Sequence, residues 1–219
     1  MIVQFLRYGP SVATLRADAR RNRDQLVEAA GALFAERGPN VPMEEIARRA
    51  GVGVGTLYRR FPDRDSLVRA VAFESFHRVV ANARIAADEP DGWSGLTRFV
   101  RQSVTDLRLA TWLSMWFAQA WADMRLEREH EELRDDLLAL LDQLVGRAQR
   151  EGSMRPEAGV GDLAVLLALV LRPLPGLPAT GAVERHVAVV LAGLRVQPGD
   201  PLPGRPLTLG DLERPGGDA

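Results

Sequence analysis

The stretch 43-MEEIARRAGVGVGTLYRRF-61 carries three glycines on alternate positions, where one short segment of helical spacing passes into another. The first segment follows Pro42 and has two carboxylates in its first turn, and both features favour the start of a helix. Gly51 ends this segment, and the second segment carries Tyr58 ahead of two arginines. Two interpretations fit these residues: a loop that cradles the phosphates of a nucleotide, or a turn that joins two short helices.

The glycine spacing argues against a nucleotide-binding loop. A dinucleotide fingerprint reads G-x-G-x-x-G and directly follows a β-strand, whereas here Thr56 stands where the third glycine belongs. The preceding residues, Glu44–Ala50, have the spacing of a helix and not of a strand. A Walker loop also fails, because it needs a lysine and all 28 basic residues of the chain are arginine.

The same residues meet the requirements of a helix-turn-helix, in which one helix supports a second that enters the DNA major groove. Gly51 can adopt the positive φ of a sharp turn, and Ala47 is small enough to let the second helix pass close by. The apolar residues that would hold the unit together are Ile46, Val52, Leu57 and Phe61. A glycine turn between two helices of an ordinary bundle, with its arginines in solvent, is the alternative.

The spacing of apolar residues is helical almost throughout the chain and predicts an all-α fold. A helix from Arg23 to Gly38 precedes the motif, and Asp63 can cap a long helix that ends near Ala86. Beyond a turn at 88–92 we expect helices at 93–109, 110–124, 128–150, 161–171 and 183–194. The tail from Pro198 is rich in proline and glycine and is predicted to be disordered.

Two segments and the spacing between them resemble the TetR family of transcriptional regulators. They are 29-AAGALFAERG-38 and 43-MEEIARRAGVGVGTLYRRFPDRDSLVRAV-71, which follow the pattern AxxLFxxxG and then EIAxxAGVxxGTLYxxFxxRxxL. The resemblance implies an all-α homodimer. Its N-terminal three-helix domain binds a palindromic double-stranded DNA operator, and its C-terminal helical domain dimerises and usually binds a small effector.

On this resemblance we expect a repressor that a small molecule of unknown identity releases from its operator. Two alternatives remain open: a dimeric DNA-binding regulator without an effector, and a helical small-molecule-binding protein or enzyme with a vestigial DNA motif. The implied domains are a basic N-terminal arm at 1–21, a helix-turn-helix domain at 22–68 with its motif at 42–61, a helical effector-binding and dimerisation domain at 69–197, and the tail at 198–219.

Carried over by position, the family's recognition helix is Val54–Arg60. The implied DNA contacts fall on Met43 in the supporting helix and on Gly53, Val54, Gly55, Thr56, Tyr58, Arg59 and Arg60. Arg64, at the start of the next helix, would lie near a phosphate. Two positions depart from the family pattern, because Gly53 stands where many relatives have serine and Arg60 where many have histidine. Arg60 would be a stronger phosphate partner than a neutral histidine.

Charge is unevenly distributed along the chain, although the net charge is only -1. Residues 1–75 carry 12 arginines against 9 carboxylates, and residues 76–219 carry 16 against 20. The positive first part fits an anionic partner. Four arginines lie just before the first predicted helix, and they form either a solvated leader or an arm that touches DNA: Arg16, Arg20, Arg21 and Arg23.

Three tryptophans within ten residues mark the C-terminal half, at positions 112, 116 and 121. Such a stripe is either core or the lining of an apolar pocket whose specificity rests on a few polar groups. The candidate effector residues are Arg108, Thr111, Trp112, Met115, Trp116 and Gln119. The helix at 161–171 is apolar on nearly every side and, with the Val183–Leu194 stripe, predicts a four-helix dimer interface.

Several function classes are disfavoured. The chain has no cysteine, which excludes disulfides and thiolate chemistry. Its longest apolar run, Leu163–Leu171, is shorter than the ~18 residues of a membrane span, and the N-terminus MIVQFLRYGP lacks a cleavage pattern, so a cytoplasmic protein is expected. The histidines lie far apart, and only a weak metal site can be drawn from Glu127, His130 and Glu131. We therefore expect no metal, no cofactor and no enzymatic activity.

Overall fold

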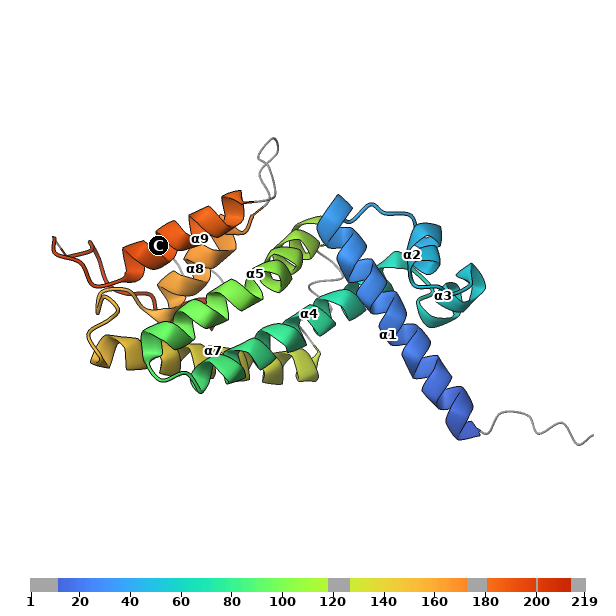
Figure 1. Cartoon of the computed structure of the whole chain (residues 1–219), viewed down its shortest axis with the longest axis horizontal. Coiled ribbons are helices and arrows are strands. Elements are labelled where there is room, and N and C mark those ends of the chain that lie inside the picture. Colours follow the sequence, from blue (N-terminus) through green and yellow to red (C-terminus); the bar gives the residue numbers. More distant parts are fainter. Residues whose placement is uncertain (1–11, 118–126, 173–180, 200, 214–219) are drawn as a thin grey trace, which may run out of the picture. The chain divides into compact units, whose positions relative to one another are not determined.

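The structure, a computed structural model, describes residues 12–117, 127–172, 181–199 and 201–213. Over these residues the prediction of an all-α fold is confirmed, and the chain divides into two compact units, Met1–Val71 and Ala72–Ala219 (Figure 1). The boundary falls inside one long helix, α4 (Arg64–Ala87), which begins in the first unit and continues into the second.

The first unit contains α1 (Val12–Arg37), α2 (Met43–Arg49), α3 (Val54–Arg60) and the first two turns of α4. Its core consists of the apolar residues that the helical spacing selects, including Leu26, Ala30, Leu33, Phe34, Ile46, Ala47, Leu57, Phe61 and Leu67. Asp63 caps α4 as predicted, because its Oδ1 atom accepts a hydrogen bond of 2.7 Å from the Ser66 N–H.

α1 begins earlier than the sequence predicts. Residues 12–21, expected to belong to a basic arm, form the first turns of this helix. No proline or glycine interrupts the chain between residues 12 and 30, and Asp18 pairs with Arg21 one turn later, which supports a continuous helix. Arg16, Arg20 and Arg21 are therefore helical residues.

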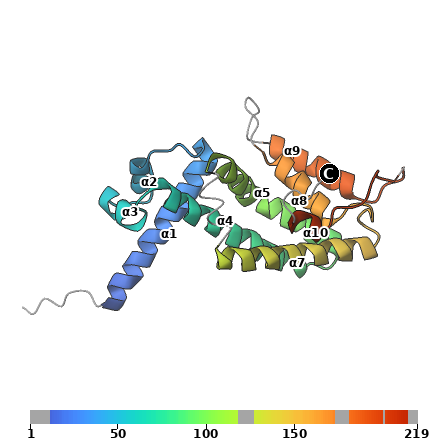
Figure 2. The same cartoon turned by 180° about the vertical axis from the view of Figure 1, so that it is seen from behind.

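The second unit contains the rest of α4, α5 (Gly92–Trp116), α7 (Arg128–Arg150), α8 (Val160–Val170), α9 (Ala182–Leu194) and α10 (Leu209–Glu213). α5 packs along α7, and α8 and α9 lie side by side (Figure 2). The prediction of two helices at 93–109 and 110–124 is wrong over the described residues. Nothing breaks the chain at Leu109–Ala110, so α5 runs to Trp116, and residues 118–124 lie outside the described ranges.

The described part of the tail differs from the expected disorder. Residues 205–211, here called the C-terminal strap, lie against the start of α8, and the Leu207 carbonyl accepts a hydrogen bond of 3.0 Å from the Gly161 N–H. Asp162 accepts both the Gly159 and the Leu207 N–H, at 2.8 and 3.0 Å. Two hydrogen bonds from Arg205 lower the pKa of the Asp211 carboxyl well below its usual range. Composition alone does not predict the hydrogen bonds to Gly161 and Asp162, because they join the strap to residues far away in the sequence.

Candidate nucleic-acid interface

The turn between α2 and α3 is closed by two backbone hydrogen bonds. The Val52 N–H donates to the Ala47 carbonyl at 3.0 Å, and the Gly51 N–H donates to the Arg48 carbonyl at 3.2 Å. Gly51 has φ +70°, the left-handed conformation that a helix-ending turn of this kind requires at this position. A side chain here would strain the backbone, so glycine at 51 sets the direction in which α3 leaves the turn.

α3 has one buried side and one exposed side. Leu57 and Phe61 pack into the core beside Ile46 and Ala47, which fixes the rotation of the helix about its axis. On the outer side Val54, Gly55, Arg59 and Arg60 are exposed, and the Tyr58 side chain is 43% exposed. Seven residues make about two turns, so this outer side presents the predicted contact residues on one short helix.

Three arginines close to the motif, at the end of α1 and on α2, are already paired. Arg37 and Arg48 both contact the Glu45 carboxylate, and Arg49 contacts Glu36 at 3.3 Å. In the part of the chain that the structure describes, Arg59 and Arg60 of α3 contact no carboxylate. α3 therefore presents two exposed arginines without a carboxylate partner among the described residues, and these are available to a phosphate.

Thr56 and Arg59 contact each other on the exposed side of α3. The Arg59 Nη2 atom donates a hydrogen bond of 3.0 Å to the Thr56 Oγ1 atom, one turn earlier on the helix. The bond occupies one of the five N–H donors of the guanidinium and restricts its direction. Four donors remain for a base edge or a phosphate.

Arg64 has a structural partner. Its Nη1 atom donates a hydrogen bond of 2.9 Å to the Pro39 carbonyl, which ties the start of α4 to the loop before α2. The side chain is half-buried. A phosphate contact by Arg64 would therefore use its remaining donors, and removing this arginine would also loosen the loop.

The structure buries one of the predicted contact residues, Met43. Its side chain is only 6% exposed and belongs to the core of the first unit, which leaves its backbone as the group that can face DNA. The glycines behave differently, because Gly53 and Gly55 have ordinary backbone angles and room for a side chain. A Cβ at Gly53 would come no closer than 4.0 Å to Thr56 Oγ1, and a Cβ at Gly55 would meet nothing. The fold requires neither glycine.

Five of the six predicted effector residues lie on the C-terminal half of α5. The Arg108 guanidinium lies 5.2 Å from the centroid of the Trp112 ring, and the Thr111 hydroxyl donates to the Leu107 carbonyl at 2.9 Å. The Trp112 Nε1 atom is buried without a hydrogen-bond partner among the described residues, and the Met115 side chain is exposed. The Trp116 side chain and Gln119 fall outside what the structure describes.

The weak metal alternative gains no support. His130 is buried and its ring lies 4.7 Å from that of Phe76, while Glu127 and Glu131 are exposed. Within the described ranges, no three His, Asp or Glu side chains gather closely enough to hold a metal ion. No helix in these ranges combines the length and the apolar content that crossing a bilayer requires.

Two family models match the chain. Residues 26–71 match the model of bacterial regulatory proteins of the tetR family, and residues 91–196 match the C-terminal domain of SbtR-like transcriptional regulators. The first match covers α2, α3 and parts of α1 and α4, and the second covers most of the second unit.

Solved structures and curated proteins agree with these matches. A TetR transcription regulatory protein from Mycobacterium vanbaalenii is 35% identical over 83% of this chain and 99% of its own, with a TM-score of 0.59. A TetR transcriptional regulator from Streptomyces coelicolor is 27% identical over 79% of this chain and 98% of its own, with a TM-score of 0.59. An HTH-type transcriptional regulator of Staphylococcus aureus is 46% identical over 54 residues. The matched residues make up 24% of this chain and 29% of that relative, so the chain matches less than a third of the relative's length.

Proposed function

Because the chain belongs to the TetR family of transcriptional regulators, we propose that it binds a palindromic operator as a homodimer and represses transcription until a small effector releases it. The observation that carries the DNA-binding step is the exposed side of α3, where Tyr58, Arg59 and Arg60 project from a helix whose other side is anchored in the core. Such a helix can enter the major groove while its arginines bind phosphates and base edges. The proposal places the protein in the cytoplasm and includes no catalytic step.

The exposed apolar side chains of α8 and α9 support the homodimer. The Leu169 side chain is 61% exposed and that of Val189 is 63% exposed, and Val165 of α8 is exposed as well. Exposed large apolar residues on two adjacent helices are unfavourable in a monomer and typical of an interface. Pairing with a second copy about a two-fold axis would bury them in a four-helix arrangement.

The effector site that we propose lies around the C-terminal half of α5. The buried, unpartnered Trp112 Nε1 supports it, because this N–H needs an acceptor that the described residues do not provide. A ligand with an acceptor oxygen and an apolar body would suit this group. Such a ligand would release the operator only if it bound the released form more tightly than the DNA-bound form.

Selection of duplexes from a random DNA pool tests the DNA-binding assignment and identifies the operator sequence in the same experiment. The expected product is an inverted repeat whose half-sites lie about 10 base pairs apart, centre to centre. The double variant Tyr58→Ala/Arg59→Ala should bind the selected duplex at least about 100-fold more weakly, since each lost contact costs about 1–3 kcal/mol. Arg128→Ala removes an exposed arginine from the second unit and serves as the matched control.

Unchanged binding by the double variant, in a protein that still unfolds cooperatively, would defeat the assignment of α3 as the DNA-binding helix.

The dimer is tested by Leu169→Glu/Val189→Glu, which places charges at two exposed apolar positions of α8 and α9. Light scattering should give the mass of a monomer for this variant. Ile85→Glu alters another exposed apolar side chain, on α4, and should leave the dimer intact.

A further inference from the structure

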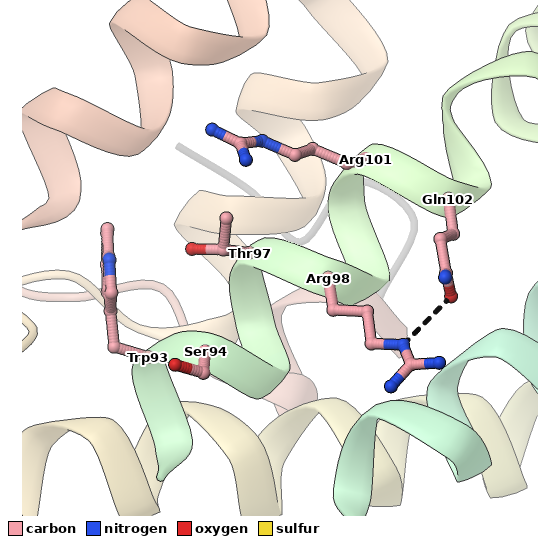
Figure 3. A pocket seen from close by; sticks show the side chains of 6 residues that line it. All are labelled: Trp93, Ser94, Thr97, Arg98, Arg101 and Gln102. Carbon is pink, nitrogen blue, oxygen red and sulfur yellow. Dashed lines mark hydrogen bonds between the residues drawn. The ribbon is translucent and has the colours of Figure 1, made fainter. Parts of the chain in front are cut away.

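A hollow of about 430 Å³ lies along the N-terminal half of α5 and contains none of the predicted effector residues. Its volume falls within the range of about 300–1,000 Å³ of small-molecule sites. The lining residues all come from α5: Trp93, Ser94, Thr97, Arg98, Arg101 and Gln102 (Figure 3).

The lining side chains form two rows. Trp93, Thr97 and Arg101 are four residues apart on the helix, and in Figure 3 the Arg101 side chain extends on the side of Thr97 and Trp93. Arg98 turns to the other side, where its Nε atom lies 3.4 Å from the Gln102 Oε1 atom. The first row therefore combines an aromatic ring, a hydroxyl and a guanidinium.

The Thr97 hydroxyl has an unmet bonding requirement. Its oxygen is covered by neighbouring atoms and has no hydrogen-bond partner among the described residues. Buried polar groups are nearly always paired, so an orphaned hydroxyl on the wall of a hollow points to a missing partner. A ligand that displaces part of the cover would supply that partner.

Charge around the hollow is positive. The nearby carboxylates are engaged: Glu89 pairs with Arg98, Asp91 accepts the Ser94 N–H and hydroxyl at 2.8 Å, and Glu151 pairs with Arg147. Arg101 contacts no carboxylate in the part of the chain that the structure describes.

A second cation lies beside one of the lining residues, Trp93. The Arg195 guanidinium lies 5.3 Å from the centroid of the Trp93 ring. Its backbone is fixed beside Met154 by a β-bridge at the end of α9. An anion beside Trp93 would therefore lie close to Arg195 as well as to the row that carries Arg101.

We propose that the Trp93–Thr97–Arg101 row binds a small planar carboxylate. The guanidinium of Arg101 can form two hydrogen bonds to the two oxygens of a carboxylate. The Thr97 hydroxyl donates a hydrogen bond to one of these oxygens, and the apolar body of the ligand packs on Trp93. This site lies at the opposite end of α5 from the predicted effector residues, and the assignment does not depend on operator binding.

Benzoate and benzamide, which share a shape and differ in charge, form the probe pair for calorimetry on the full-length protein. Benzoate should bind at least about tenfold more tightly than benzamide, because only the carboxylate pairs with Arg101. Arg101→Gln should weaken benzoate binding about tenfold or more, and Thr97→Val about fivefold. Arg150→Gln, at an exposed position on α7, should leave it unchanged.

Each variant is compared with the parent by circular dichroism, so that lost binding is separated from lost folding. Inorganic phosphate provides the third probe and should bind more weakly than benzoate, since it has no planar body to place on Trp93. The proposal is overturned by equal binding of benzoate and benzamide, by benzoate binding that survives Arg101→Gln, or by no benzoate binding at all.

Discussion

The Arg59 guanidinium donates a hydrogen bond of 3.0 Å to the Thr56 hydroxyl, and both side chains lie on the exposed side of α3. The contact orients a cation before DNA arrives. An arginine that is already positioned loses less side-chain entropy on binding than a mobile one. We therefore expect Thr56 to contribute to operator recognition through Arg59 as well as through any contact of its own.

Thr56→Val removes the hydroxyl while keeping the shape of the side chain. We expect weaker operator binding, and a smaller effect of the same change when Arg59→Ala is already present, because the two residues act together. A double-mutant cycle by fluorescence anisotropy should give a coupling energy of about 0.5–3 kcal/mol. Thr56→Ser retains the hydroxyl and should behave like the parent. Additive effects would show that the contact plays no part in binding.

Gly55→Ala should change stability and DNA affinity in opposite directions. Alanine is the better helix former by about 1 kcal/mol, and a Cβ at this position meets no atom of the protein, so the midpoint of urea unfolding should rise. The added methyl group would stand where the backbone approaches a phosphate, so operator affinity should fall.

Gly51→Ala gives the contrasting result. The φ of Gly51 is +70°, which disfavours any side chain, so Gly51→Ala should lose about 1–2 kcal/mol of stability.

The prediction for Gly55 would be contradicted if the Gly55→Ala protein bound the operator as tightly as the parent, because Gly55 would then not face the DNA.

Salt dependence tests the role of the α3 arginines. If about 6–10 phosphates are contacted, raising salt from about 50 to about 200 mM should weaken binding by about 10³–10⁵-fold. Arg60→Gln should reduce the slope of log affinity against log salt by about 1, whereas Arg128→Gln on α7 should leave it unchanged. A flat salt response of the parent protein would contradict a phosphate-dominated interface.

The first unit is the part of the molecule that its sequence predicts most completely. Gly51 follows a helical segment, where glycine commonly ends a helix with positive φ, and the apolar spacing of Ile46, Leu57 and Phe61 indicates which side of α3 is buried. Met43 shows where such reasoning stops. A motif assigns a contact to a position, but whether the side chain or the backbone makes it depends on packing, and here the side chain is in the core.

The second unit is less predictable because its contacts join residues far apart in sequence. The apolar spacing predicts two helices where α5 is continuous, since local spacing does not show that the helix continues past Leu109. The positive hollow was not expected, although Trp93, Thr97 and Arg101 recur at a spacing of four and could have suggested it. The contact between Arg195 and Trp93 could not be predicted from local sequence, because it depends on how α9 packs against α5.

Acid should weaken the start of α5 through Asp91. Hydrogen bonds from the Ser94 N–H and hydroxyl lower the pKa of its carboxyl below the ordinary value of 3.8. The stabilising effect of a group with a lowered pKa is fully present above its unfolded value and is lost as the pH falls through the folded value. Asp91→Asn should therefore be less stable than the parent near neutral pH, and the difference should shrink below about pH 4.

Urea unfolding measured at several pH values checks this expectation. Ser94→Ala removes the hydroxyl donor and leaves the backbone N–H, so its stability should fall between those of the parent and Asp91→Asn. A difference between the parent and Asp91→Asn that stays constant down to about pH 3 would show that the carboxylate charge does not matter there.

The C-terminal strap constrains how this chain can diverge. A Cβ on Gly161 would lie 2.6 Å from the Leu207 Cβ atom, and the Asp162 carboxylate holds the backbone of both segments. A relative that keeps the strap must keep small residues before Asp162, whereas one that loses the strap is released from that requirement. We therefore expect relatives to keep or lose four features together: glycine at 159, glycine at 161, a carboxylate at 162 and the strap. The strap and the start of α8 would then evolve as one unit.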